Sequence, residues 1–163
     1  MRLKKTQEVL RSLGKYVIQQ SRSALSKKGK NTSKGLYESL GYDVETSTDG
    51  AKVIFTMANY ARFVDQGVSG KEKKYNTPYG FKNKKPPMKP LMDWAKARNF
   101  RLRDAKGKYV KGNYKAIGFV LQNSIYKKGI KPSLFFTKPF NMAIDKYQKD
   151  IATAYLQDIT DQL

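Results

Sequence analysis

The ionisable side chains of this sequence offer few combinations that could perform chemistry. The chain has no cysteine and no histidine, so it can build no internal disulfide, thiolate nucleophile, Cys/His zinc site or histidine-based catalytic triad. Asp43 and Glu45 stand two positions apart, which places both carboxylates on one face of a strand. Such a pair can hold a hard cation such as magnesium. Carboxylates on an exposed strand face are more often simply solvated, so we predict no metal or cofactor site.

Catalytic motifs are equally scarce. The sequence contains no Gly-x-x-x-x-Gly-Lys-Ser/Thr run that could cradle phosphates. Without histidine, a nuclease would need carboxylates and lysines brought together from distant parts of the chain. We therefore predict that the protein is not an enzyme and has no catalytic residues. A metal-dependent nuclease stays open as a third class, resting only on Asp43 and Glu45.

Positive charge is the dominant feature of the composition. The 163 residues include 33 Lys and Arg against 13 Asp and Glu, a net charge of +20. Residues 1–35 carry +9 and residues 66–131 carry +15, whereas residues 36–65 carry −3 and residues 132–163 carry −1. A charge of this size attracts polyanions or acidic protein surfaces. We therefore expect the partners of the chain to meet its middle segment.

Basic and aromatic residues are interleaved in that middle segment. Such a pattern can dock on a neighbouring protein, remain as a solvated face, or bind nucleic acid by stacking and phosphate contact. We expect docking first, solvation second and nucleic acid third. The candidate interface residues are Lys71, Lys73, Lys74, Tyr75, Tyr79, Lys82, Lys84, Lys85, Arg101, Arg103, Lys108 and Lys111.

The elements that must position these residues begin with a helix and a hairpin. Apolar residues at helical spacing predict a helix over about 3–25, with Leu3, Leu10, Leu13, Val17 and Ala24 on its inner face. A short helical or extended piece over 35–40 follows. Residues 42–46 and 51–57 alternate as two strands, and the turn signal Asp49-Gly50 joins them.

The second half of the chain alternates between helices and loops. Residues 60–66 predict a short helix ended by Gly67 in a left-handed cap. Residues 68–90 predict a long loop, and Pro90 suits the first turn of the next helix. Residues 100–114 predict a small basic hairpin, and residues 115–127 predict a helix stopped by Gly129.

A long final helix is predicted from about Thr137, which suits an N-cap, with Pro139 in the first turn. One face carries a row of apolar residues that should pack on the sheet: Phe140, Ile144, Tyr147, Ile151, Tyr155 and Ile159. No apolar run approaches the length of a membrane span. The sequence thus predicts one α+β domain over residues 1–163, a small antiparallel sheet packed by long N- and C-terminal helices, with a basic insertion at about 68–115.

Three blocks of sequence resemble the neck and tail-completion proteins of tailed bacteriophages, the head–tail joining family. Residues 32–40, Thr-Ser-Lys-Gly-Leu-Tyr-Glu-Ser-Leu, are similar to the family's opening before its first strands. Residues 60–67, Tyr-Ala-Arg-Phe-Val-Asp-Gln-Gly, are similar to its Tyr-Ala-x-aromatic-Val-acidic-x-Gly helix. Residues 131–143 are similar to the Arg-Pro-Phe-Leu-x-x-Ala segment before its final helix. The family-motif residues are Tyr60, Ala61, Phe63, Val64, Asp65, Gly67, Pro132, Phe135, Phe136, Pro139 and Phe140.

Side-chain chemistry assigns these motif residues a structural role. We expect Tyr60, Phe63 and Val64 to pack in the core on their short helix. Asp65 should cap or pair locally, a simpler role than catalysis. The segment 71–115 is longer than a minimal family member needs.

The resemblance implies a structural virion protein that forms part of a ring between the head connector and the tail. Its expected partners are copies of itself and portal, connector or tail proteins, with possible nonspecific contact to DNA in the channel and none to membranes. The expected location is the neck of the virion, after synthesis in the host cytoplasm. The alternative function is a non-catalytic basic nucleic-acid-binding protein, whose affinity would fall steeply with salt.

Overall fold

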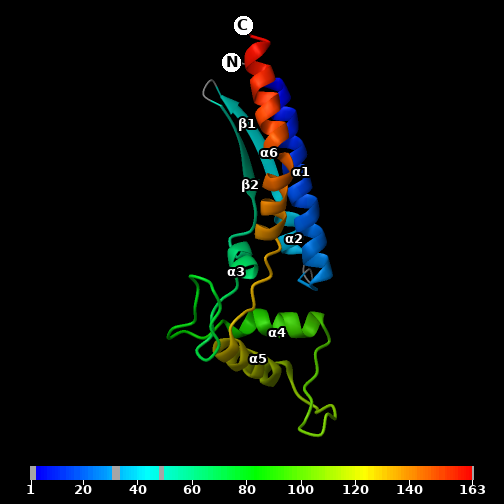
Figure 1. Cartoon of the computed structure of the whole chain (residues 1–163). Coiled ribbons are helices and arrows are strands. Elements are labelled where there is room, and N and C mark those ends of the chain that lie inside the picture. Colours follow the sequence, from blue (N-terminus) through cyan, green and yellow to red (C-terminus); the bar gives the residue numbers. More distant parts are fainter. Residues whose placement is uncertain (1–2, 31–33, 48–49, 163) are drawn as a thin grey trace. The chain divides into compact units, whose positions relative to one another are not determined.

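The computed structural model describes residues 3–30, 34–47 and 50–162 (Figure 1). The elements, in chain order, are α1 (Lys4–Lys27), α2 (Gly35–Ser39), β1 (Gly41–Ser47), β2 (Gly50–Thr56), α3 (Ala61–Gln66), α4 (Met88–Ala97), α5 (Tyr114–Lys128) and α6 (Thr137–Thr160). The predicted α+β class is confirmed, because a two-stranded antiparallel sheet is accompanied by long N- and C-terminal helices. Within the described residues, no helix is both long and apolar enough to cross a membrane.

The chain divides into two compact units. Unit 1 consists of residues Met1–Ala61 and Leu134–Leu163, and unit 2 consists of Arg62–Ser133. The basic segment predicted at about 68–115 falls inside unit 2. Unit 2 contains 19 of the 33 basic residues and 4 of the 13 acidic ones, a net charge of +15. Most of the excess positive charge therefore belongs to one unit.

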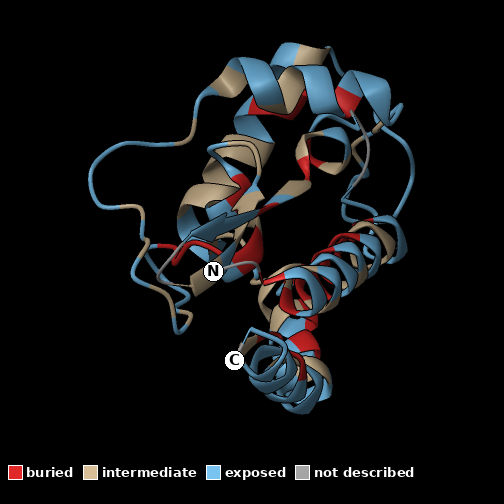
Figure 2. Cartoon of the chain, turned by 90° about the horizontal axis from the view of Figure 1, so that it is seen from above, coloured by how far each residue is buried: buried red, intermediate tan, exposed pale blue. Residues whose placement is uncertain are grey.

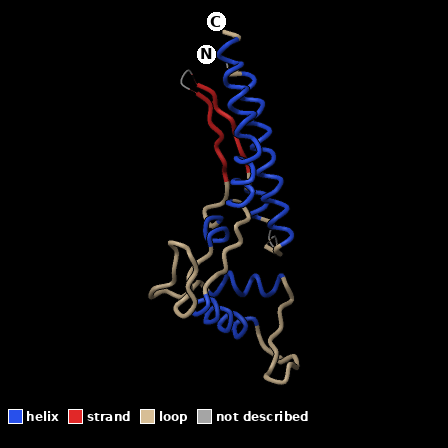
Figure 3. Tube along the Cα trace, viewed as in Figure 1, coloured by secondary structure: helices blue, strands red, loops and turns tan. Residues whose placement is uncertain are grey.

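Unit 1 is built on the antiparallel pair α1 and α6, with the hairpin alongside (Figure 3). Leu13 and Val17 of α1 meet Ala143 of α6 in a fully buried cluster. Val17 and Ala143 expose none of their surface, and the buried residues are coloured red in Figure 2. Small and branched side chains at this point let the two helices approach closely.

The hairpin pairs β1 with β2 in a continuous register from Gly41↔Thr56 to Ser47↔Gly50. Val44 is the buried residue of β1 and lies opposite Val53. The helix α1 packs on both strands. The contact is close at Gly14, because a Cβ placed there would lie 2.6 Å from Cε2 and 2.8 Å from Cγ of the Tyr42 ring. Glycine at this position therefore sets how near the strand can approach the helix.

Polar side chains fix the ends of the unit 1 elements. The guanidinium of Arg22 donates to the carbonyls of Tyr37 (3.2 Å) and Leu40 (3.0 Å). It also lies 5.1 Å from the centre of the Tyr37 ring. The Ser39 hydroxyl donates to the Leu36 carbonyl at 2.8 Å and accepts from the Ala58 N–H at 3.0 Å. Arg22 therefore ties α2 to α1, and Ser39 ties α2 to the segment after β2.

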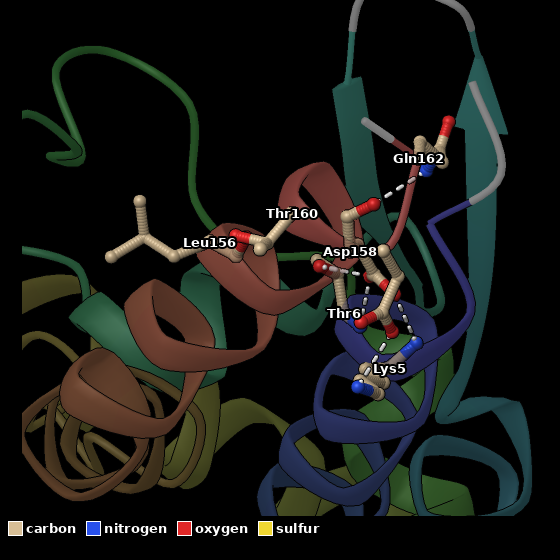
Figure 4. A network of polar contacts seen from close by, with 7 residues as sticks. Lys5, Thr6, Leu156, Asp158, Thr160 and Gln162 are labelled. Carbon is tan, nitrogen blue, oxygen red and sulfur yellow. Dashed lines mark hydrogen bonds and ion pairs between the residues drawn. The ribbon is translucent and has the colours of Figure 1, made fainter.

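The first turn of α1 is capped from the far end of the chain. The buried Asp158, near the end of α6, accepts hydrogen bonds from the backbone N–H groups of Lys5 (3.0 Å) and Thr6 (2.8 Å) and from the Thr6 hydroxyl (2.8 Å) (Figure 4). Burial alone raises the pKa of the Asp158 carboxyl. These three bonds outweigh that effect and hold the pKa below its ordinary value.

Unit 2 is centred on the pair α4 and α5, which pack side by side. Ala95 and Ile117 are buried. At Gly118 of α5, a Cβ would lie 2.6 Å from Cγ of Met92 on α4. The Asn113 side chain caps α5 by accepting from the Ala116 N–H at 2.8 Å. The helix ends at Gly129, which has φ 73°.

The predictions for unit 2 and for the buried face of α1 have mixed outcomes. The helix after the long loop begins at Met88, which places Pro90 in the first turn as predicted. The segment 100–114 forms a short antiparallel turn without regular strands, where a hairpin was predicted. An isolated bridge joins Arg103 to Tyr109, and the Val110 N–H donates to the Leu102 carbonyl at 3.0 Å. The turn at Asp104–Gly107 and the alternating charged residues favour solvent over strand pairing. In α1, Leu25 takes the buried position that was assigned to Ala24.

One prediction for the last helix, its N-cap, was wrong, and the predicted apolar row is confirmed only in part. Thr137 is the first helical residue of α6, and Phe136 stands at the N-cap position. The buried side of α6 runs through Pro139, Ala143, Ala154 and Asp158, facing α1, while Ile144 and Tyr155 are exposed. Only Phe140, Tyr147 and Ile151 of the predicted apolar row join the core cluster. The long α1 provides more surface than a two-stranded sheet, so α6 turns its small residues toward α1.

Candidate interaction surface

The end of the second motif block and the start of the third meet inside unit 2. The N–H of Val68 donates to the Ile130 carbonyl (2.8 Å), and the N–H of Ile130 donates back to the Val68 carbonyl (2.7 Å). Next to this bridge, the Ser133 hydroxyl donates to the Val64 carbonyl at 2.6 Å, and the Ser133 N–H donates to the Asp65 carbonyl at 3.0 Å. The segment that enters unit 2 and the segment that leaves it are therefore joined by main-chain hydrogen bonds.

Gly67 makes this junction possible. Its φ is 76°, as predicted for the cap of α3, and a Cβ there would lie 2.5 Å from the Ile130 carbonyl oxygen and 2.7 Å from Cδ of Pro132. Only glycine combines a left-handed backbone with this close approach. The motif residues Gly67 and Pro132 are thus structural neighbours.

The motif side chains around this junction have different environments. Ala61 and Asp65 are buried, and Phe63 packs edge-to-face on Tyr79 with ring centres 4.7 Å apart. Tyr60 is 47% exposed, so the prediction that it packs in the core was wrong. It precedes α3 rather than lying on it, and its side chain therefore does not share the helix's inward face.

The third motif block also supplies core residues to unit 1. Phe135 is completely buried, and Pro139 is buried in the first turn of α6. Phe55 of β2 contacts Phe136 and Phe140 edge-to-face, with ring centres 5.3 and 6.0 Å away. This aromatic cluster joins the start of α6 to the hairpin. In the first block, Thr32 and Ser33 lie outside the described residues, as does Asp49 of the hairpin turn.

The long loop after α3 is held by local hydrogen bonds although it contains no helix. Ser69 and Gly80 form a parallel bridge, in which the Ser69 N–H donates to the Tyr79 carbonyl and the Phe81 N–H donates to the Ser69 carbonyl, each at 2.9 Å. The Ser69 side chain accepts from the Tyr75 N–H at 2.9 Å. These bonds close the basic segment 71–79 into a loop.

The first group of predicted interface residues lies on this loop and the segment that follows it. The lysines of the group, namely Lys71, Lys73, Lys74, Lys82, Lys84 and Lys85, are exposed, and Tyr75 and Tyr79 are half-buried. Lys73 lies 5.5 Å from the centre of the Tyr75 ring. Lys85 donates to the Asn123 side chain at 2.7 Å and lies near the rings of Phe119 and Tyr126, which holds this part of the segment against α5.

The second group gathers around one exposed ring. Tyr109 is 62% exposed, with the guanidinium carbons of Arg103 and Arg101 at 4.6 and 5.9 Å from its ring centre. The Arg103 side chain also donates to the Tyr109 hydroxyl at 2.8 Å. Lys108 and Lys111 are exposed on the same segment. The sequence analysis had selected the cations of this group but not Tyr109.

The structure adds other aromatic residues that the sequence analysis did not select. Trp94 is 39% exposed and packs on Phe100 with ring centres 5.8 Å apart. The guanidinium of Arg98 lies 5.9 Å from the Trp94 ring centre. The i,i+4 spacing of Trp94 and Arg98 on a helix was the available sequence signal.

Two neighbouring hollows open in this part of unit 2. One, of about 410 Å³, is lined by Asn99, Phe100, Arg101, Tyr109, Val110, Lys111, Gly112, Tyr114 and Ile117. The other, of about 480 Å³, is lined by Arg98, Asn99, Phe100, Arg101, Arg103 and Tyr109. Neither lining includes a carboxylate, so each hollow presents cations and aromatic rings together.

The paired carboxylates of β1 each have a partner close by. Glu45 makes an ion pair with Lys52 across the hairpin at 2.8 Å. Asp43 accepts a hydrogen bond from the neighbouring Val44 N–H at 2.8 Å. Over the described ranges 3–30, 34–47 and 50–162, no group of three or more acidic residues could hold a metal ion. The two side chains are therefore explained by pairing and by local backbone contacts.

Comparison of the chain with known protein families, with curated proteins and with solved structures gives no match. The functional assignment therefore rests on the residues and geometry described above.

Proposed function

We propose that this chain is a structural virion protein of a tailed bacteriophage, a neck or tail-completion subunit that joins the head connector to the tail within a ring. The proposal starts from the three motif blocks and their resemblance to that family. Its partners would be other copies of the chain and portal, connector or tail proteins. The protein would act at the head–tail junction after synthesis in the host cytoplasm.

The observation that supports the proposal is the structural use of the motif residues. Gly67 and Pro132 close the base of unit 2, Phe136 and Phe140 build the core with Phe55, and Ser39 fixes the segment after β2. A motif that marked a catalytic site would instead gather polar side chains in a cleft. Motifs that specify a framework are expected of an assembly subunit, whose working parts are its surfaces.

Unit 2 offers a surface suited to a neighbour in a ring. Its net charge of +15 would be drawn to an acidic face of an adjacent protein. A ring uses two different patches on each subunit, and unit 1, whose net charge is +5 because the chain carries +20 and unit 2 carries +15, provides a surface of different character. Repetition around a ring would turn individually weak contacts into a stable assembly.

Cryo-electron microscopy of virions of the encoding phage would test the proposal, with this chain located in the density. The expected result is a closed ring at the capsid–tail junction, with the segment 68–115 touching neighbouring subunits. Absence of the chain from the particle would overturn the proposal.

A genetic experiment gives an independent test. Phage carrying a stop codon in this gene should accumulate heads and tails that fail to join, and the wild-type chain supplied in trans should restore joining. A Lys71→Glu/Lys73→Glu/Lys74→Glu variant that folds should fail to restore it. Arg11→Glu/Lys15→Glu, on an exposed part of α1, is the control for added negative charge. Normal joining in the absence of the chain would contradict the proposal.

A further inference from the structure

The two hollows of unit 2 surround Tyr109 and share Asn99, Phe100, Arg101 and Tyr109 in their linings. Volumes of about 410 and 480 Å³ lie within the usual range for sites that take a small organic group. Because the hollows have common walls, one extended ligand could occupy both.

Two aromatic rings at this place are accessible to solvent. Tyr109 leaves 62% of its surface exposed, and Trp94, which packs on Phe100, leaves 39% exposed. Arg103 holds the Tyr109 ring by a hydrogen bond to its hydroxyl and by contact with its face. A ring that is oriented by arginine but not covered is prepared to stack on a planar group.

Two of the cations at this place, Arg101 and Arg103, have no carboxylate partner in the part of the chain that the structure describes. Asp104, the acidic residue nearest in sequence, directs its carboxylate to the backbone N–H groups of Lys106 and Lys108 in the turn, each at 2.9 Å. The guanidinium groups therefore remain available to phosphates, which they bind well because of their planar arrangement of donors.

We propose that the two hollows form a binding site for single-stranded nucleic acid. Bases would stack on Tyr109 and Phe100, while Arg101, Arg103 and Lys111 would contact the phosphates. A duplex keeps its bases stacked inside and could use only the cations, so the exposed rings favour a single strand. An acidic peptide would likewise leave the rings unused. This site does not depend on the proposed role in the virion.

Fluorescence anisotropy with labelled ligands tests the proposal on the purified full chain. The probes are an oligothymidylate of about 20 nucleotides, a duplex of the same length and a polyglutamate peptide of similar charge. We expect the oligothymidylate to bind more tightly than the duplex at the same salt concentration, and polyglutamate not to displace it. Trp94 is the only tryptophan, so its fluorescence should also change when the strand binds.

Variants separate stacking from charge. Tyr109→Leu should weaken oligothymidylate binding about tenfold, and Tyr109→Phe, which keeps the ring, should bind nearly as the wild type does. The double variant Arg101→Ala/Arg103→Ala should lower the slope of log K against log salt by about 1.4, which corresponds to two phosphate contacts. Arg11→Ala/Lys15→Ala removes the same charge from the exposed side of α1 in unit 1 and should leave that slope unchanged.

Three results would overturn this site. They are equal affinity for duplex and single strand with no effect of Tyr109→Leu, displacement of the strand by polyglutamate, and no binding at low salt. The variants should fold, because the segment around Tyr109 is exposed. Circular dichroism of each variant checks that a loss of binding is not a loss of folding. A chain that binds the strand but is absent from virions would contradict only the proposed structural role.

Discussion

Asp158 of α6 caps the helix on which Thr6 lies, although 152 positions separate the two residues. The carboxylate accepts from both the N–H and the hydroxyl of Thr6, each at 2.8 Å, in a site where Asp158 is 3% exposed. The first N–H groups of a helix have no partner within the helix and carry partial positive charge. One buried carboxylate therefore satisfies the start of α1 and attaches the end of α6 to it.

The first prediction concerns this cap. Asp158→Asn keeps the shape of the side chain but removes its negative charge and one acceptor, so the midpoint of thermal unfolding should fall by roughly 2–4 °C. Circular dichroism at 222 nm measures the change. The matched control is Asp161→Asn, which removes only the exposed ion pair with Lys5. Because an exposed ion pair contributes little to the free energy of unfolding, this variant should change the midpoint by less than about 1 °C. Equal effects of the two variants would contradict the assigned role of Asp158.

The second prediction is a pH dependence of the same contact. The folded pKa of Asp158 is lowered, so its ionised form contributes stability at pH values above the unfolded pKa of about 3.8. That contribution should be lost as the pH falls through the lower folded value. The difference in unfolding midpoint between the wild type and Asp158→Asn should thus be largest near pH 7 and shrink at acid pH. A difference that grows with acidification would show the opposite sign of shift.

The third prediction concerns Gly67 at the base of unit 2. Gly67→Ala should lower the free energy of unfolding by about 3 kcal/mol, because the new Cβ meets Ile130 and Pro132 and alanine is strained at positive φ. Urea titration followed by Trp94 fluorescence measures the loss in unit 2.

Gly107→Ala is the matched control for Gly67→Ala. Gly107 has nearly the same φ, 78° against 76°, but a Cβ there would meet nothing within 4 Å. It should therefore cost only the backbone strain, about 1 kcal/mol. If the two variants lose equal stability, the close approach of Ile130 and Pro132 does not matter.

The fourth prediction tests the contact of α1 with the hairpin. Gly14→Ala raises helix propensity by about 1 kcal/mol, yet the Cβ would overlap the Tyr42 ring, so we expect a net destabilisation of about 1–2 kcal/mol. In a Tyr42→Leu background, the same substitution should be neutral or stabilising. A double-mutant cycle measured by urea denaturation gives the coupling between the two positions. Independent effects would show that the helix and the strand separate freely here.

Local chemistry explains why much of the fold was predictable from the sequence. The apolar spacing of Leu10, Leu13 and Val17 marked the buried side of α1. Glycines at positive φ, Gly67 and Gly129, marked the ends of α3 and α5 as predicted. These features depend on neighbours within a few residues, which the order of the residues displays directly.

Contacts between segments far apart in the sequence could not be predicted in the same way. The apolar row on α6 was predicted to pack on the sheet, and Phe140 does contact Phe55 of β2. The rest of the row divides, because α1 offers the larger surface: Ala143 and Ala154 are buried, while Tyr155 is exposed. In the sequence, nothing distinguished Asp158 from an acidic residue on the surface, because the N–H groups that donate to its carboxylate belong to the other end of the chain.

The candidate site shows the same division. The composition alone identified a basic middle segment, because charge is counted without knowledge of the fold. The clustering of Arg101 and Arg103 on the face of Tyr109, beside the hollows lined by Phe100, depends on how a segment without regular strands folds back on itself. Helices and turns arise from local periodicity, whereas the partners of a buried carboxylate or an exposed ring arise only when distant segments compete for the same surface.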